Sequence, residues 1–452
     1  MMKNIQELLS AKGSRDVLLY LKHNPGATAP MINAHLANKT DLTLTTATIY
    51  RRLKDFEEAQ LITRLPTNSE RVILTFYAEE VLNKQKRWLN MNFQDLLKDL
   101  GKYYSIGVPI SHEKFTVYPV LKVDVSSPVL GLLEAEKQEL AWIQETEGSE
   151  SVEILEAINK SKNPVLIPYL HQVEGGKQDR TIFEPIIIPI GYDESNPLKI
   201  PVKCIERSRW TYSSSRGETT SYKFKSAGTR MASQMANISA KGADQTTVWE
   251  TVDAVAEELD FGMAEAPTRS YREIQEKSYE KDQEFSTLLK TLSSGLSLKD
   301  QVGIICFYGD KCLGIELFGS NNLWSQFSEL VLKGFLTDRV FMKKMEIGQK
   351  LPDNLKDVLK NEFKDIKVNK GKATGTGDLF RFNNKKWQGI SIQYKGNPVH
   401  LYATKEQVDI LEGRKSRGMP GIPRPQVQTM QEPLVQQQEI IIEQVLDESE
   451  DA

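Results

Sequence analysis

The chain has 452 residues, 39% of them hydrophobic, and a formal net charge of −3. This length allows more than one hydrophobic core, so we expect two domains, and the near-neutral charge excludes a globally basic surface for nucleic acid. Three cysteines exclude a disulfide framework and indicate a reducing compartment. No signal-peptide pattern and no run of ~18 apolar residues is found, so we expect a cytoplasmic protein with no membrane partner.

The first part of the chain predicts three short helices followed by a β-hairpin. Apolar residues recur at helical spacing in the segments 14–24, 29–38 and 45–60. The residues expected to face inward in the second and third helices are Met31, Ile32, Leu36, Ala47, Ile49, Leu53 and Phe56. Two β-like runs follow at 61–65 and 71–75, joined by a short polar turn.

The exposed face of the third predicted helix suits duplex DNA. It combines small hydroxyls, an aromatic ring and two basic groups, on Thr45, Thr46, Thr48, Tyr50, Arg51 and Lys54. Such side chains can reach both base edges and phosphates in a major groove. Arg64 and Arg71 add one basic residue to each strand of the hairpin. The residues predicted to contact DNA are Thr46, Thr48, Tyr50, Arg51, Lys54, Arg64 and Arg71.

This order of elements resembles the winged helix-turn-helix family. The resemblance covers residues 12–78 and depends on Thr46-Ala47-Thr48-Ile49-Tyr50-Arg51-Arg52-Leu53 and Glu58-Ala59-Gln60-Leu61-Ile62, which look like the recognition helix and the start of the wing in bacterial and archaeal repressors. It implies DNA binding. Residues 1–100 carry 14 Lys and Arg against 11 Asp and Glu, and this net charge of +3 gives DNA binding mild support. The alternative is a helical interaction module that never touches DNA.

A long connecting helix is predicted over residues 76–100, with Gly101 at its end. Its apolar stripe consists of Val81, Leu82, Trp88, Leu89, Phe93, Leu96 and Leu97. The stripe either pairs with its copy in a second subunit or packs against the chain's own C-terminal domain. A homodimer is favoured, because one isolated module offers few phosphate contacts for specific binding.

Beyond residue 103 the pattern indicates a β-rich mixed domain, and the whole chain therefore an α+β fold. Five runs rich in valine, isoleucine and proline predict strands, at 115–123, 152–158, 165–173, 181–190 and 198–205. Further elements are helices at 246–259, 270–292 and 323–335, a hairpin at 302–317, a partly helical insertion at 341–372 and a β pair at 378–382 and 389–402. Prolines 185, 189 and 201 favour edge strands or bulges.

Two features outside this pattern also lead to predictions. If Gly309-Asp310 forms a two-residue hairpin turn, Phe307 pairs with Cys312 and Cys306 with Leu313, so the two sulfurs face opposite sides of the sheet and form no disulfide. Residues 413–452 are rich in proline, glutamine and acidic residues and are expected to be disordered. This tail either docks on a partner through its short apolar patch or only solubilises the chain.

Four ordered motifs in the β-rich region resemble one family. They are Gly175-Gly176-Lys177-Gln178-Asp179-Arg180, Ile200-Pro201-Val202-Lys203-Cys204-Ile205-Glu206-Arg207-Ser208-Arg209-Trp210, Asp244-Gln245-Thr246-Thr247-Val248-Trp249 and Leu317-Phe318-Gly319-Ser320. The resemblance is to the domain associated with ADP-ribosylglycohydrolases and rhodanese-phosphatase proteins, over about 105–405. It implies a mixed domain and a link to NAD or ADP-ribose metabolism. The family usually has Asn at the position of Asp179 and a glycine-like residue at Ser208.

The same motifs could form an anion site. The glycine pair allows close backbone approach, and Lys177, Gln178 and Arg180 supply donors. Arg209 adds a cation, Trp210 a stacking surface, and Glu206 an acceptor for a ribose hydroxyl. The alternative is structural: Glu206 pairs with Arg180 or Arg230, and Trp210 fills a core. The predicted ligand-binding residues are Lys177, Gln178, Arg180, Glu206, Arg209 and Trp210.

Signatures of catalysis are weak. The five histidines never fall at metal-ligand spacing, so no metal site is predicted. The glycine-rich stretch 371–377 lacks the Gly-Lys-Ser/Thr ending of a phosphate loop, and Cys204 reads as a small buried hydrophobe. No catalytic residue and no cofactor is predicted. We expect a DNA-binding regulator whose β-rich domain senses a small anionic, nucleotide-like ligand. The alternative is an enzyme of ADP-ribose or NAD metabolism that uses the N-terminal module for tethering or dimerisation.

Overall fold

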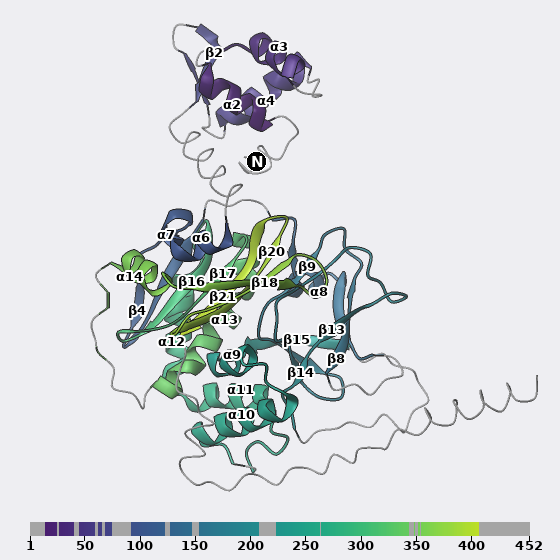
Figure 1. The fold of residues 1–452 in the computed structure, drawn as a ribbon, viewed down its shortest axis with the longest axis vertical. Helices are drawn as coiled ribbons and strands as arrows, with labels where there is room; N and C mark the ends of the chain where they lie inside the picture. The colour runs from purple at the N-terminus through teal and green to yellow at the C-terminus, as the bar shows by residue number, and fades with distance from the viewer. Residues whose placement is uncertain are drawn as a thin grey trace, which may run out of the picture. The chain divides into compact units, whose positions relative to one another are not determined.

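The architecture is that of a computed structural model, shown in Figure 1. The residues it describes are 14–24, 27–39, 45–58, 62–65, 68–74, 92–122, 127–146, 153–207, 223–262, 264–342, 348, 351–352 and 354–405. The predicted acidic tail at 413–452 lies outside them. Within the described residues, helices and strands are mixed and the larger part of the chain is β-rich. No helix in these ranges has both the length and the apolar character needed to cross a membrane.

The N-terminal part contains three helices and an antiparallel hairpin, in the predicted order. They are α2 (Ser14–His23), α3 (Ala29–Lys39), α4 (Thr46–Glu58), β1 (Ile62–Leu65) and β2 (Asn68–Leu74). Their shared core includes Leu21 of α2, Ile32 of α3 and Leu53 of α4. These large side chains recur at helical spacing, so each amphipathic helix buries one face against the other two.

Two side chains predicted to face this core point outward instead. Met31 is 50% exposed, and Ala47 is exposed as well. Each helical residue advances by about 100° around the axis. Met31 therefore falls beside the buried stripe of α3, and Ala47, two residues before the buried Ile49, falls on the opposite side of α4. The inward assignment of Met31 and Ala47 was wrong.

The described end of the predicted connecting helix packs within its own chain. Two short helices are present, α6 (Phe93–Lys98) and α7 (Leu100–Tyr103), with a break at Asp99 (φ −146°, ψ 69°). Gly101 lies inside α7, so it does not end a helix as predicted. The Phe93 ring stacks on Phe380 at 4.6 Å between centroids, and Leu96 and Leu97 are buried in the same cluster. Trp88 and Leu89 lie outside the described residues.

A nine-stranded antiparallel sheet dominates the β-rich part, in the order β18-β19-β20-β21-β17-β16-β5-β3, with β4 also paired to β5. Its strands are β3 (Ser105–Ile106), β4 (Ile110–His112), β5 (Phe115–Leu121), β16 (Gln301–Tyr308), β17 (Lys311–Phe318), β18 (Lys367–Lys372), β19 (Asp378–Asn383), β20 (Trp387–Tyr394) and β21 (Asn397–Lys405). The predicted insertion at 341–372 thus contributes an edge strand, β18, besides one helix.

Helices cover both faces of this sheet (Figure 1). One face packs against α12 (Gln283–Ser294) and α13 (Asn321–Met342), the other against α6, α7 and α14 (Leu355–Glu362). Cys306 belongs to the first core and Cys312 to the second, and both thiols are free, as predicted. A bulge after Cys306 pairs it with Gly314, so the predicted partner Leu313 was wrong.

Two smaller sheets complete the β-rich part. The seven-stranded sheet has the order β13-β8-β7-β15-β10-β11-β14, and the three-stranded sheet β12-β9-β6. Their elements are β6 (Leu130–Gly131), α8 (Leu132–Lys137), β7 (Ala141–Gln144), β8 (Ile154–Asn159), β9 (Val165–Ile167), β10 (His171–Gly175), β11 (Arg180–Thr181), β12 (Ile186–Ile188), β13 (Leu198–Pro201), β14 (Lys203–Cys204) and β15 (Lys223–Arg230). Both β12 and β13, beside the three prolines, are edge strands as predicted.

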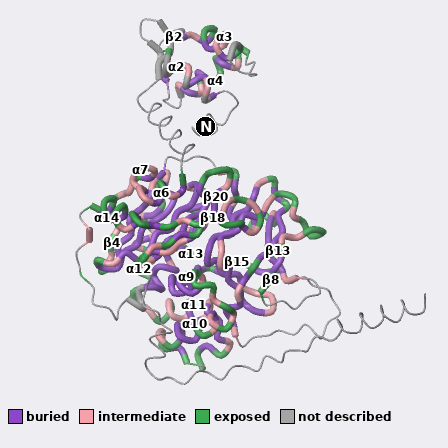
Figure 2. The backbone as a smooth tube through the Cα atoms, in the orientation of Figure 1, coloured by how far each residue is buried: buried purple, intermediate pink, exposed green. Residues whose placement is uncertain are grey.

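Four further helices follow β15 along the chain: α9 (Ser233–Ala240), α10 (Gln245–Glu258), α11 (Tyr271–Lys281) and α12. The predicted single helix at 270–292 is two helices, because Asp282 leaves the helical conformation and its side chain accepts from the backbone N–H of Glu284 at 3.1 Å. Helix α13 continues to Met342, beyond its predicted end at 335. Figure 2 shows buried residues concentrated on the strands and inner helix faces.

Candidate functional site

Three of the four family motifs meet at one place in the structure. The side-chain amide of Gln245, at the start of α10, accepts from the Cys204 N–H at 2.9 Å and donates to the Cys204 carbonyl at 2.7 Å. Gln178 Nε2 donates to the Glu206 carbonyl at 2.7 Å. These bonds join the turn before β11, strand β14 and the N-terminus of α10 into one polar cluster.

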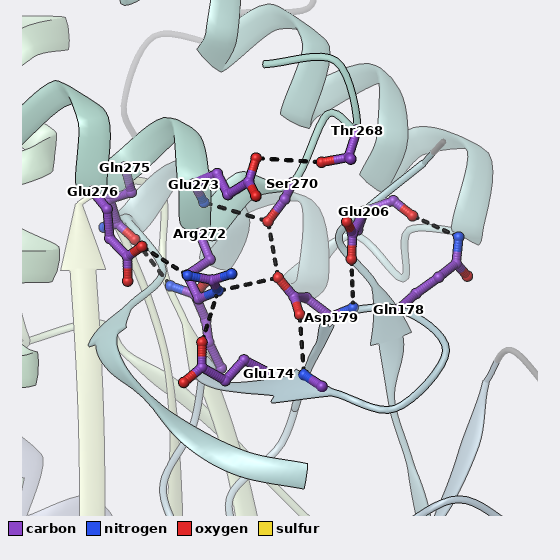
Figure 3. A network of polar contacts seen from close by, with 12 residues as sticks. Glu174, Gln178, Asp179, Glu206, Thr268, Ser270, Arg272, Glu273, Gln275 and Glu276 are labelled. Atoms are coloured by element: carbon purple, nitrogen blue, oxygen red, sulfur yellow. Dashed lines mark hydrogen bonds and ion pairs between the residues drawn. The ribbon is translucent and has the colours of Figure 1, made fainter. Parts of the chain in front are cut away.

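Asp179 is the centre of this cluster (Figure 3). Its carboxylate accepts from the Gly175 N–H at 3.2 Å, the Ser270 hydroxyl at 2.9 Å and Arg272 Nε at 3.2 Å. Its own N–H donates to Glu206 Oε2 at 3.0 Å. The carboxylate of Asp179 is therefore balanced by the guanidinium of Arg272 in the same chain.

Arg272 holds several carboxylates together. Besides Asp179, it lies 3.1 Å from Glu174 and 2.7 Å from Glu276. Burial by itself lowers the pKa of Arg272, but the surrounding negative charges raise it above its ordinary value. This network ties the strand end of β10 to the first turn of α11.

The glycine pair, Gly175 and Gly176, packs closely against other residues of the same chain. Gly175 and Gly176 have φ of +110° and +52°, and a Cβ on Gly176 would lie 2.4 Å from Phe224 Cζ. The next residue, Lys177, donates its backbone N–H to Glu145 Oε1 at 2.9 Å. The glycines therefore allow a tight turn over the ring of Phe224, which explains their presence without a ligand.

Arg180 is enclosed, with no exposed surface. Its Nη1 donates to the carbonyl of Gln178 at 2.8 Å and, more weakly, to that of Asp179 at 3.4 Å. Nε and Nη2 have no hydrogen-bond partner, and no ion pair involves Arg180, in the part of the chain that the structure describes. Arg180, Gln178 and Glu206 thus lie together but are all buried.

Glu206 and Arg230 do not pair with each other. Glu206 binds the backbone of Asp179, whereas Arg230 pairs with Glu316 at 3.0 Å. Arg209 and Trp210 lie outside the described residues. Cys204 is buried, its thiol donates to the Glu206 carbonyl at 3.1 Å, and burial raises its pKa. A thiol with a raised pKa is a poor nucleophile at neutral pH.

A pocket of about 540 Å³ is lined by none of the predicted ligand-binding residues, although Pro201, Val202 and Lys203 of the second motif form part of its wall. The segment around the end of α9, strands β19 and β20 and the loop before β12 form its walls, and its charged lining residues are Glu184, Lys203, Lys241 and Arg381. Aromatic lining residues are Tyr169, Phe183, Phe382 and Tyr402. The sequence did not predict this pocket, because most of its residues come from distant segments that share no local motif.

Pairing within the chain orients the pocket's charged groups. Arg381 Nη2 lies 2.9 Å from Glu184 Oε2, and the Thr374 hydroxyl donates to Glu184 Oε1 at 2.5 Å. Burial raises the pKa of Tyr169 to about 12, although a hydrogen bond with Ser239 opposes the shift. The phenol of Tyr169 therefore remains neutral at physiological pH.

A second titratable cluster lies between α8, β10 and β15. His171 Nε2 is 2.8 Å from the Ser226 hydroxyl, and burial lowers the pKa of His171 to about 3. Burial raises the pKa of Glu136 to about 7, although hydrogen bonds from Ser226 oppose the shift. Near neutral pH the imidazole is uncharged, and Glu136 changes between its neutral and charged forms.

We expect this carboxyl to make stability depend on pH. The folded-state pKa of Glu136 is raised, so its protonated form stabilises the fold below pH 4.5, and this contribution is lost as pH rises through about 7. The loss by pH 8 is about 3 kcal/mol. Glu136→Gln should therefore unfold at higher urea concentration than the parent at pH 8, but not at pH 5. Glu139→Gln, an exposed site nearby, should leave the parent's pH profile unchanged; identical profiles for the two variants would contradict the expectation.

The predicted DNA-contact residues on α4 mostly face outward. Tyr50 is 44% exposed, Arg51 and Lys54 are exposed, and Thr46 and Thr48 are half-buried. The Thr48 hydroxyl lies 2.8 Å from that of Thr45, and Thr46 accepts from Asn33 Nδ2 at 3.1 Å. Arg64 and Arg71 lie in β1 and β2, and their side chains fall outside the described part.

Comparison with known proteins supports one part of the sequence analysis. The model of the ARG and Rhodanese-Phosphatase-superfamily-associated Protein domain matches residues 103–404, which agrees with the resemblance carried by the four motifs. No curated protein and no solved structure matches the chain. Because the match spans more than half of the sequence, the chain belongs to the ARG and Rhodanese-Phosphatase-superfamily-associated Protein domain (ARPP-1) family.

Proposed function

We propose that this protein is a DNA-binding regulator, in which α4 reads duplex DNA and the family domain senses a small anionic ligand. The observation that carries the proposal is the exposed face of α4. Ile49, Leu53 and Phe56 bury one side of this helix, while the opposite side presents Tyr50, Arg51 and Lys54 to solvent. A three-helix unit with a hairpin and such a helix resembles the winged helix-turn-helix arrangement, in which the third helix enters the major groove.

The basic residues of α4 differ in whether they contact the rest of the chain. Arg52 Nη1 donates to the Ser14 hydroxyl at 3.0 Å, which attaches α4 to α2. Arg51 and Lys54 both expose their side chains to solvent. Their charges are therefore available for phosphates, and each such contact adds both affinity and salt dependence.

The double variant Arg51→Ala/Lys54→Ala should weaken DNA binding by about tenfold or more and reduce the salt slope by roughly 0.9 per lost phosphate contact. Fluorescence anisotropy with a mixed-sequence duplex, measured over a series of salt concentrations, gives both quantities. The matched control is Lys364→Ala/Lys367→Ala, which removes the same charge from exposed sites of the family domain. If the α4 variant and the control bind alike, the N-terminal helices are an interaction module that does not touch DNA.

A further inference from the structure

We infer that the 540 Å³ pocket at the end of α9 binds a small anion that carries a planar ring. This deepens the proposed function, because it gives the sensed ligand a site and a chemical class. The site differs from the residues first predicted: Gln178, Arg180 and Glu206 are not among its lining residues. Its volume is typical of small-molecule sites, which range over about 300–1,000 Å³.

The charged lining favours an anion. Lys203, Lys241 and Arg381 contribute three positive groups, against two carboxylates, that of Glu184 in the lining and that of Glu153 beside Lys203. Lys203 also pairs with Glu153 at 2.5 Å, which holds the ammonium in place. Side-chain amides of Asn369, Asn383 and Gln388 add neutral donors and acceptors around the same space. The local excess of cations, rather than the near-zero charge of the whole chain, selects the ligand.

Arg381 is the cation best prepared to bind. Its side chain is 53% exposed, and its ion pair with Glu184 uses only Nη2. Glu184 is itself fixed by the hydroxyl of Thr374. A guanidinium held in this way keeps two other nitrogens for a phosphate or carboxylate, and less rotational freedom is lost when the ligand arrives.

The inner wall of the pocket is apolar and aromatic. Tyr169, Val202, Ile390 and Tyr402 are all buried residues that also line this space. The rings of Tyr169 and Tyr402 lie 5.3 Å apart at 57°. Aromatic and aliphatic walls favour a flat uncharged group. A ligand that places a ring against this wall and a charged group near Arg381 satisfies both parts of the lining.

The test uses the full chain and three compounds that separate charge from ring. ADP carries both, adenosine carries only the ring, and pyrophosphate carries only the charge. We expect calorimetric titration to show ADP binding at least tenfold more tightly than either fragment, because only ADP meets both parts of the site. Pyrophosphate binding as tightly as ADP would overturn the ring assignment, and an absence of ADP binding at millimolar concentration would overturn the proposal.

Variants locate the site. Arg381→Gln should weaken ADP binding by tenfold or more and leave the melting temperature of the free protein nearly unchanged, because an exposed ion pair contributes little stability. Lys360→Gln, an equal charge change on the exposed face of α14, should bind ADP like the parent. Equal ADP affinity in Arg381→Gln and the parent would place binding elsewhere and overturn the proposal.

DNA-binding measurements on the same variants distinguish a failure of the ligand inference from a failure of the proposed DNA binding. Without ADP, Arg381→Gln should bind DNA like the parent, and Arg51→Ala/Lys54→Ala should bind ADP like the parent. If the pocket fails its test while the α4 variant loses DNA affinity, only the ligand inference is wrong. If ADP binds and also changes DNA affinity, linkage requires that DNA change ADP affinity by the same factor.

Discussion

Replacing Glu316 with Gln should lower the free energy of unfolding by about 3–5 kcal/mol, because it leaves a buried arginine without its counter-charge. Glu316 has no exposed surface, and its carboxylate lies 3.0 Å from Arg230 Nε and 3.1 Å from His400 Nε2. Burial alone would lower the pKa of Arg230, but Glu316 and other nearby groups raise it above its ordinary value. The guanidinium therefore stays charged and depends on this acid.

The surrounding structure leaves Arg230 no route to water. Its guanidinium packs 4.7 Å from the Phe335 ring centroid and 5.2 Å from that of Tyr402. A Cβ on Gly334 would lie 2.7 Å from Arg230 Cζ, so only glycine lets α13 pass this close. The charge cannot move to solvent when Glu316 is neutralised, which is why the expected loss is large.

Urea denaturation of Glu316→Gln, with Arg230→Met/Glu316→Leu as the matched comparison, measures this loss. The double variant replaces both charges with apolar groups and should recover most of the stability, because no charge is then left unpaired. A loss below about 1 kcal/mol in Glu316→Gln would show that the pair contributes no more than a surface ion pair.

Replacing Asp179 with Ala should lower the free energy of unfolding by about 2–4 kcal/mol, the second large effect that we expect. The substitution removes the acceptor for three donors: the Gly175 N–H, the Ser270 hydroxyl and Arg272 Nε. Asp179 is buried, so water cannot replace these bonds without rearrangement. Strand β10 and helix α11 would lose the contacts that hold the family motifs together.

Asp179→Asn is the matched variant, because it keeps the shape of the side chain and changes the carboxylate to an amide. It keeps one amide oxygen as an acceptor and removes only the charge opposite Arg272, which retains Glu174 and Glu276. We expect a loss of about 1 kcal/mol. Urea denaturation of both variants checks the order. Equal losses in Asp179→Ala and Asp179→Asn would mean that the charge, rather than the hydrogen bonds, stabilises the cluster.

Elements whose pattern lies within one short segment could be predicted from the sequence. The N-terminal helices, the hairpin at β16 and β17 and the family motifs all belong to this class, because apolar periodicity and turn residues act between near neighbours. The errors were local too. Met31 and Ala47 lay one or two residues from a buried stripe, where a helical step of about 100° decides the side of the helix. Asp282 divided one predicted helix, since a capping aspartate competes with helix continuation.

Contacts between distant segments decided the rest. Asp179 and Arg272 are far apart in sequence, and no local pattern pairs them, so the same residues read equally well as a ligand site or as an internal network. Arg180 and Gln178 are buried, which favours the internal network over the ligand site. Burial arises only when strands from different segments pack together, so the sequence pattern does not show it. The pocket has the same origin: Lys203 of β14, Lys241 after α9 and Arg381 of β19 come from distant segments and line one space only in the folded chain. Sheet order follows from long-range pairing, which sequence periodicity does not encode.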